Sequence, residues 1–189
     1  GWHEAFIILG IAKPQSGGSQ ANTMNKKADT TLVSPEAIKD SPLGADLNKD
    51  QCQTLASVVG SICLKKGTVL LEEGHSDDTL FVVSSGSLEV IKPTGGGDVI
   101  TLQLLHAGDM AGILGFVDGV PHSAGIRALR RCELIVLDRK ALEQLLKKDP
   151  EVVYQVMRSI VRAAHRILGR MNAQFVEMSN YISKQHGRY

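Results

Sequence analysis

Two pairs of carboxylates near the middle of the chain have the residue types of an acid–base catalyst. Glu72 and Glu73 precede Gly74, and Asp77 and Asp78 follow it. Because a glycine turn places neighbouring charged side chains in water, we expect solvated carboxylates here and not a catalytic pair. The sequence shows no nucleophile elbow, no Walker-type phosphate loop and no HExxH helix. These residues therefore predict a protein that is not an enzyme.

Histidine and cysteine are the other residue types that could support chemistry, as ligands of a metal ion or of haem iron. No Cys/His pair lies at metal-ligand spacing among His75, His106, His122, His165, Cys52, Cys63 and Cys132. We therefore predict no metal site and no cofactor. An odd number of separated cysteines is typical of reduced thiols, which favours a cytoplasmic location.

Composition excludes several further classes of protein. The 189 residues include 21 Lys and Arg against 20 Asp and Glu, with 43% hydrophobic and 4% aromatic residues. The hydrophobic fraction is too high for a disordered chain, and balanced charge with few aromatic rings argues against nucleic-acid binding. The apolar run Ala5–Ala12 is much shorter than the ~20 residues of a membrane span. A buried strand or an ordered tail is favoured there over a signal-peptide core.

Short apolar runs punctuated by glycines predict a central domain made mainly of β-strands. The expected strands lie at residues 69–71, 79–84, 87–91, 99–105 and 132–137. Short helices are expected from Ser34-Pro35, over 47–59, and from Asp138 to about residue 148, since serine and aspartate are good N-caps. The pattern indicates an α+β fold that is mainly β, an antiparallel sandwich or roll with flanking helices.

The chain divides by composition into four segments. They are an N-terminal segment and linker at 1–45, the β-domain at 46–149, a long helix at 150–183 and a tail at 184–189. Asp149-Pro150 starts the long helix, with aspartate as N-cap and proline at its first position.

Two apolar stripes run along the predicted long helix. One is a heptad seam, which predicts a dimer interface formed by Val153, Met157, Ile160, Ala164, Ile167, Met171 and Met178. The second stripe passes through Val152, Val156, Leu168, Phe175 and Ile182. We expect one stripe to pack on the β-domain and the other on the same helix of a second copy, which predicts a homodimer.

The order of these elements resembles the cyclic-nucleotide-binding domain family, which includes catabolite-activator-type regulators and protein-kinase regulatory subunits. The resemblance rests on the run from Leu64 to Ile91 and on the segment AGILGFVDGVPHSAGIRAL from Ala111 to Leu129. It implies an antiparallel β-roll of the double-stranded jelly-roll type with a C-terminal dimerisation helix. In this family the second segment is the phosphate-binding cassette, a short helix whose backbone N–H groups face the cyclic phosphate.

Two positions of the cassette depart from the family pattern. The resemblance places the ribose-binding glutamate of the family at Ile113, after Gly112, and its phosphate-binding arginine at His122. Isoleucine cannot accept a hydrogen bond, and a neutral histidine cannot replace a guanidinium. We expect affinity for cyclic AMP to fall by roughly two to four orders of magnitude. His122 is then either a ligand contact or an exposed loop histidine.

The predicted ligand pocket combines the cassette with the middle of the long helix. Its residues are Gly112, Ile113, Leu114, His122, Ser123, Ala124, Ile167 and Leu168. In the family, polar side chains of the long helix reach the purine, whereas the matching stretch here, 163–168, is mostly apolar. The pocket therefore suits a nucleotide less well than a hydrophobic ligand, or no ligand at all.

Two functions follow from this resemblance. The first is a non-catalytic ligand-sensing module whose long helix reports occupancy; the alternative is a dimeric protein-interaction module with a vestigial pocket. Arg158, Arg162, Arg166 and Arg170 recur every four residues, either as a solvated face or as a surface for an acidic protein partner. We expect no DNA-binding domain, no nucleic-acid partner and no membrane partner.

Overall fold

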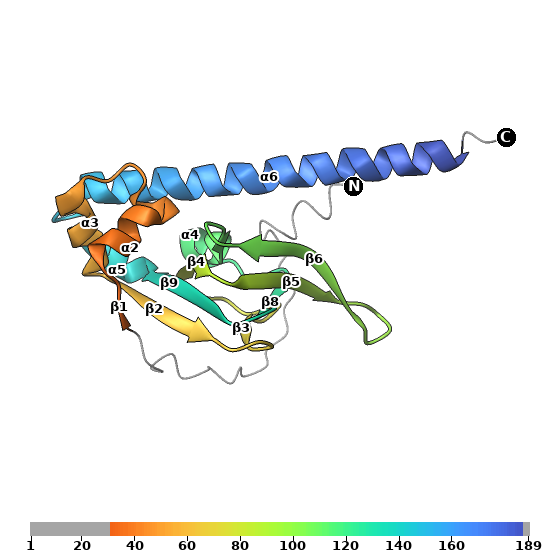
Figure 1. Ribbon diagram of the computed structural model, residues 1–189, viewed down its shortest axis with the longest axis horizontal. Helices are drawn as coiled ribbons and strands as arrows, with labels where there is room; N and C mark the ends of the chain where they lie inside the picture. Colours follow the sequence, from red (N-terminus) through yellow and green to blue (C-terminus); the bar gives the residue numbers. More distant parts are fainter. Residues whose placement is uncertain (1–30, 187–189) are drawn as a thin grey trace.

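The computed structural model describes residues 31–186, with side chains through Ser183. Figure 1 shows a β-roll with short helices at one end and one long helix across the top. The predictions for residues 1–30, including the apolar run Ala5–Ala12, lie outside the described residues.

Short helices form where the sequence supplies N-caps. Strand β1 (Thr31–Leu32) leads into helix α2 (Pro35–Asp40), whose cap Ser34 accepts a hydrogen bond from the Ala37 N–H at 3.1 Å. A 3₁₀ turn, η1 (Pro42–Gly44), precedes helix α3 (Lys49–Ala56). Asn48 and Gln51 form a reciprocal capping box at the start of α3, which satisfies two N–H groups at that end. Helix α3 is shorter than the predicted 47–59, because Val59 already begins a strand.

Nine strands, all paired antiparallel, form two sheets within the described residues. They are β1 with β2 (Val59–Leu64), β3 (Val69–Leu71), β4 (Thr79–Ser85), β5 (Ser87–Pro93), β6 (Val99–His106), β7 (Met110–Ala111), β8 (Gly125–Ala128) and β9 (Cys132–Asp138). One sheet has the order β1-β2-β9-β4-β7 and the other β3-β8-β5-β6. This arrangement confirms the predicted fold class, a mainly β antiparallel roll with flanking helices and a long C-terminal helix.

A glycine makes the tight link between β4 and β5, the strands through which the chain passes from one sheet to the other. Gly86 has φ +88°, and a Cβ there would lie 2.3 Å from the Arg131 carbonyl oxygen. Any larger residue would have to displace the backbone of the strand pair, since L-residues rarely adopt this φ and the space is filled.

The hydrophobic core has two parts. One lies between the two sheets and is centred on Phe81, Leu88 and Leu134, all at most 1% exposed. The other lies between the first sheet and the helices, and includes Val152 and Val156 of the long helix at 0% exposed. The long helix is therefore part of the protomer's core along its first half.

Asp138 and Pro150 start the two C-terminal helices as predicted. Helix α5 (Arg139–Leu145) follows Asp138, whose side chain accepts hydrogen bonds from the N–H groups of Lys140 and Ala141. Helix α6 (Pro150–His186) ends three residues beyond the predicted 183. Its C-terminal part extends past the β-roll in Figure 1.

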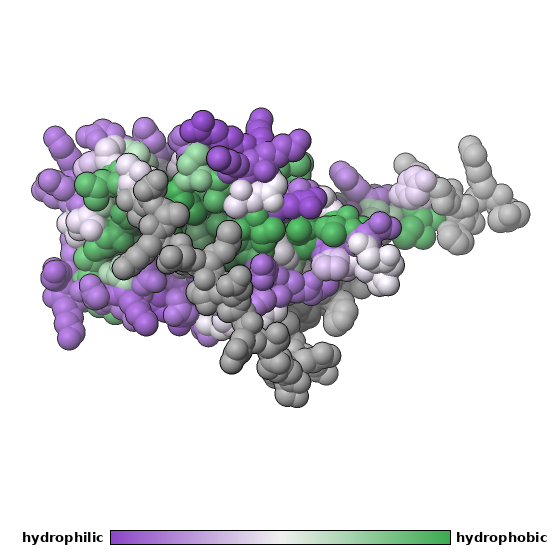
Figure 2. Space-filling model, turned by 90° about the horizontal axis from the view of Figure 1, so that it is seen from below, coloured by the Kyte–Doolittle hydropathy of each residue, from purple (hydrophilic) through white to green (hydrophobic). Residues whose placement is uncertain are grey.

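The structure revises the predicted seam of α6. Val153, Ile160 and Ile167 are 8%, 2% and 5% exposed because they pack in the core of their own protomer. They are not available to a second copy. A neighbouring series keeps heptad spacing and takes residues from both predicted stripes, with Tyr154 and Val161 added. Its half-buried members Met157, Ala164 and Met171 pack at the edge of the core. Its other members are Tyr154, Val161, Leu168, Phe175, Met178 and Ile182. We call this series the outer seam; its residues are exposed or half-buried, and Figure 2 shows hydrophobic surface on the extended part of the helix.

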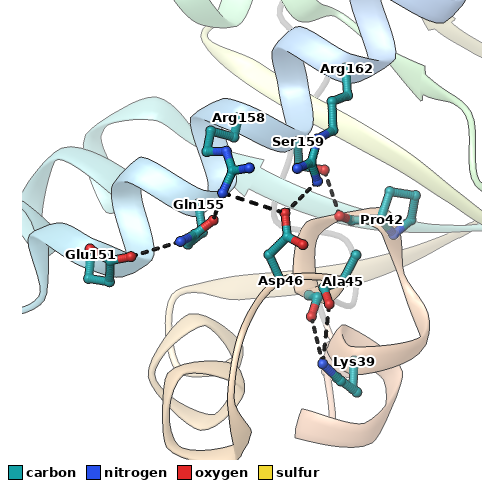
Figure 3. Close-up of polar contacts among 10 residues, drawn as sticks. Lys39, Pro42, Ala45, Asp46, Glu151, Gln155, Arg158, Ser159 and Arg162 are labelled. Carbon is teal, nitrogen blue, oxygen red and sulfur yellow. Dashed lines mark hydrogen bonds and ion pairs between the residues drawn. The ribbon is translucent and has the colours of Figure 1, made fainter.

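Arginines of α6 hold the helix to the rest of the protomer. Asp46, just after η1, pairs with Arg162 and lies 4.0 Å from the Arg158 guanidinium (Figure 3). Between them, the Ser159 hydroxyl donates to the Pro42 carbonyl at 2.5 Å. Further along, Arg170 pairs with Asp109 at 2.9 Å. Three of the four regularly spaced arginines thus bind acids of the same chain, which reduces their value as a surface for an acidic partner.

An ion pair on the second sheet, between the buried Glu89 and the half-buried Arg127, makes stability depend on pH. The Arg127 guanidinium bonds Glu89 at 2.6 Å, and with the Thr101 hydroxyl at 2.8 Å it holds the pKa of the Glu89 carboxyl below its ordinary value of 4.5. The depressed folded pKa means that this stability is complete above pH 4.5 and is lost as the pH falls through the folded value.

We expect Glu89→Gln to lower the melting temperature at pH 7 by a few degrees, about the effect of one charged hydrogen bond. The difference from the unaltered protein should shrink as the pH falls below 4.5. Thermal melts followed by circular dichroism across pH 3–7 measure both effects, with the exposed Glu133→Gln on β9 as the control for loss of a surface charge. A constant difference at all pH values would contradict the assignment.

Candidate functional site

Glycines allow the cassette segment to lie close to strand β4. Helix α4 (Ile113–Asp118) begins after Gly112, whose φ is +80° and whose added Cβ would lie 2.6 Å from the Thr79 carbonyl oxygen. One turn later, a Cβ on Gly115 would lie 2.6 Å from the Asp77 carbonyl oxygen. The spacing of these two glycines therefore has a steric cause, which is the close approach of α4 to the start of β4.

Two charged side chains bind backbone carbonyls of this segment, one within α4 and one after it. The Arg139 guanidinium bonds Asp78 and donates to the Gly115 carbonyl at 3.2 Å. The Lys92 ammonium bonds Glu73 and the Ser123 carbonyl, each at 2.8 Å. One carboxylate of each pair considered above, Glu73 and Asp78, thus forms an ion pair that supports the cassette.

His122 is buried, at 9% exposed, and is not an exposed loop histidine. Two hydrogen bonds to the loop after β3 fix its backbone: the His122 carbonyl accepts from the Gly74 N–H at 2.7 Å, and the His122 N–H donates to the His75 carbonyl at 2.8 Å. Its ring lies over α4, where the Cε1 atom would be 2.9 Å from a Cβ on Gly115. Gly115 therefore leaves the space that the imidazole ring occupies.

A cavity of about 60 Å³ lies between α4, the second sheet and α6. Seven of the eight predicted ligand residues line it: Gly112, Ile113, Leu114, His122, Ser123, Ala124 and Ile167. Leu168 does not line it, because one residue along the helix is a rotation of ~100°, which places Leu168 on the outer seam. Whether these seven bind a ligand remains a prediction.

Further lining residues come from strands that sequence reasoning did not connect with the site. Leu71, Val90, Leu105, Met110 and Ile126 add apolar wall, and Gln103 adds a carboxamide. Alternation along 99–105 groups Gln103 with Thr101 on the outward face, and the bulge at Leu102 is what turns Gln103 inward. Among the described residues, the lining contains no lysine, arginine, aspartate or glutamate, and His122 is its one histidine.

Neither a metal centre nor a membrane span is found in residues 31–186. No group of three His, Cys, Asp or Glu side chains in this part of the chain is placed to hold a metal ion. None of its helices combines the length and apolar character needed to cross a bilayer.

Comparison with known proteins agrees with this geometry. Residues 62–149 match the cyclic nucleotide-binding domain family, as the resemblance predicted. A solved cyclic nucleotide-binding domain from Methylobacillus flagellatus is 26% identical with a TM-score of 0.60, covering 79% of this chain and 80% of that chain.

Two curated relatives are longer proteins. The chain is 29% identical over 119 residues to the cAMP-activated global transcriptional regulator CRP of Salmonella typhimurium, covering 62% of this chain and 57% of the relative. It is 26% identical over 126 residues to an uncharacterized NTE family protein of Mycobacterium bovis, covering 67% of this chain and 21% of that protein. The chain thus spans only part of the length of both relatives.

Proposed function

We propose that this protein is a non-catalytic, cytoplasmic ligand-sensing module whose altered cassette does not bind cyclic AMP tightly. The observation that carries the proposal is the uncharged lining of the cavity, with Ile113 and His122 at the positions where the family has a glutamate and an arginine. A cyclic phosphate in this cavity would have no permanent positive charge to neutralise it. That lack of compensation would cost roughly several kcal/mol of binding free energy.

The long helix supports the signalling part of the proposal. Ile167 of α6 lines the cavity, while Leu168, the next residue, lies on the outer seam. A ligand that moved Ile167 would move the seam with it, because both residues belong to one helix. The outer seam has four heptads of apolar side chains, and burial of this seam in a homodimer is the arrangement that hides it from water.

Isothermal titration with cyclic AMP and cyclic GMP tests the ligand class. We expect no heat of binding at micromolar concentrations of either nucleotide, because neither the ribose contact nor the phosphate clamp of the family is present. Dissociation constants in the micromolar range or tighter would overturn the proposal that the cassette is altered in function.

The small volume of the cavity favours a second candidate function. The cavity measures about 60 Å³, and most of the residues that line it are apolar. A dimeric protein-interaction module with a vestigial pocket would need no more space, and its partner would be a protein. A small metabolite that stays bound through purification, detected by native mass spectrometry, would count against this alternative.

A further inference from the structure

The cavity contains a buried carboxamide that has no hydrogen-bond partner within the described residues. Gln103 is 9% exposed, and neither its Oε1 nor its Nε2 atom has a partner there. A buried amide in this condition destabilises the folded protein, and buried polar groups of native proteins are almost always bonded. An unbonded amide that faces a cavity is therefore arranged for something that enters the cavity.

The surroundings of Gln103 show how it is directed inward. Gln103 lies opposite Val90 in the β5–β6 pairing, and both residues line the cavity. A bulge follows at Leu102, and past it Thr101 turns to the outer face and bonds Glu89. The bulge thus separates a bonded polar residue on the outer face from an unbonded one on the inner face of the same strand.

We propose that the cavity binds a small, uncharged, planar molecule that presents an adjacent hydrogen-bond donor and acceptor to Gln103. This inference rests on the proposed sensing function and specifies its ligand class. A carboxamide offers one acceptor and two donors, so its complement is another carboxamide, a lactam or the edge of a nucleobase. Val90, Leu105 and Ile126 supply apolar walls for a flat ring, and in the described part of the chain no lysine, arginine, aspartate or glutamate lines the cavity to bind an ionised group.

Nicotinamide and nicotinate provide a matched pair of probes. Both have the same ring and size, but only nicotinamide is neutral and carries the donor–acceptor pair. Ligand-observed NMR on the whole protein should detect binding of nicotinamide, uracil or adenine at millimolar concentrations. Nicotinate should bind at least 10-fold more weakly than nicotinamide. Failure of all three neutral probes, or equal binding of nicotinate and nicotinamide, would overturn this inference. Tight binding of cyclic AMP is a different outcome, which would overturn the proposed function itself.

Substitution of Gln103 tests the same contact from the protein side. Gln103→Met keeps the length of the side chain and removes both polar atoms, and Gln103→Leu provides a second apolar variant. We expect the affinity for the neutral probe to fall about 10- to 100-fold, which corresponds to the loss of one or two hydrogen bonds. The melting temperature without ligand should rise by a few degrees, since an unsatisfied amide is removed.

Thr101→Val is the control, because it removes a polar group that is bonded on the outer face of the same strand. It should lower the melting temperature and leave probe binding unchanged. Unchanged probe binding in the two Gln103 variants, or a fall in their melting temperature equal to that of Thr101→Val, would overturn the assignment of Gln103 as a ligand contact.

Discussion

The double substitution Ile113→Glu and His122→Arg should make this protein bind cyclic AMP at least ~100-fold more tightly than the unaltered chain. Both residues line the cavity, on either side of Gly115. The glutamate would supply an acceptor for a ribose hydroxyl, and the arginine a permanent charge with paired donors for the phosphate. Charge-assisted bonds of this kind contribute ~1.5–3 kcal/mol each, which accounts for the expected gain. Isothermal titration measures it directly.

A matched control separates the site from the added charges. Val117→Glu with Leu129→Arg introduces the same two side chains at positions that are 37% and 38% exposed and outside the cavity lining. This variant should bind cyclic AMP no better than the unaltered protein. Single His122→Arg is the safer variant for folding, because Ile113 belongs to the apolar core whereas His122 is already a polar side chain. Equal affinity of the double variant and the unaltered protein, with both folded by circular dichroism, would show that something other than these two residues decides the ligand.

Phe175→Glu should convert a dimer into a monomer. Phe175 is 53% exposed and occupies the centre of the extended part of the outer seam. In a symmetric dimer each copy would bury one phenylalanine, worth roughly 1.5–3 kcal/mol, so the substitution should weaken association at least ~100-fold. Sedimentation velocity at tens of micromolar should show a dimer for the unaltered protein and a monomer for the variant.

Ala173→Glu is the matched control for this experiment. It adds the same charge two residues away, at an exposed position off the outer seam. Association should remain as in the unaltered protein, and both variants should remain folded by circular dichroism because neither position belongs to the protomer's core. If the unaltered protein itself sediments as a monomer, the prediction that the outer seam forms a dimer interface is wrong.

Local signals were sufficient for most elements of the fold. The caps at Ser34 and Asp138 and the proline at 150 start helices where the residue types predict them. Helix α3 was predicted too long because the spacing of Leu55, Val58 and Val59 fits a helix, whereas Val59 in fact pairs with Leu137 of β9. A four-residue strand such as β8 could not be separated from the cassette, since so short a segment carries too little periodicity.

The site could be predicted where it follows the cassette and, through the family resemblance, at Ile167 of the long helix. Gly112 to Ala124 are adjacent in sequence, so their meeting at one cavity needs no long-range information. Gln103 comes from a strand whose orientation depends on a bulge, and no local pattern specifies that bulge.

The seam of α6 was ambiguous for a definite reason. Met157, Ala164 and Met171 keep heptad spacing with Val153, Ile160 and Ile167, and equally with Val161, Leu168 and Phe175. Packing of the helix against the first sheet and the short helices buries the first of these alternatives, and that contact is not visible in the periodicity of the helix.

The ion pair between Arg170 and Asp109 has a mechanical consequence. Asp109 lies three residues before Gly112, so the last clamp on α6 sits on the turn that leads into the cassette. Beyond this ion pair, α6 continues for about 16 residues, or ~24 Å, with one free end. A tilt of about 5° at the clamp would displace the tip by ~2 Å, which exceeds the tolerance of a close-packed seam. A shift too small to disturb the β-roll would thus be magnified at the far end of the helix.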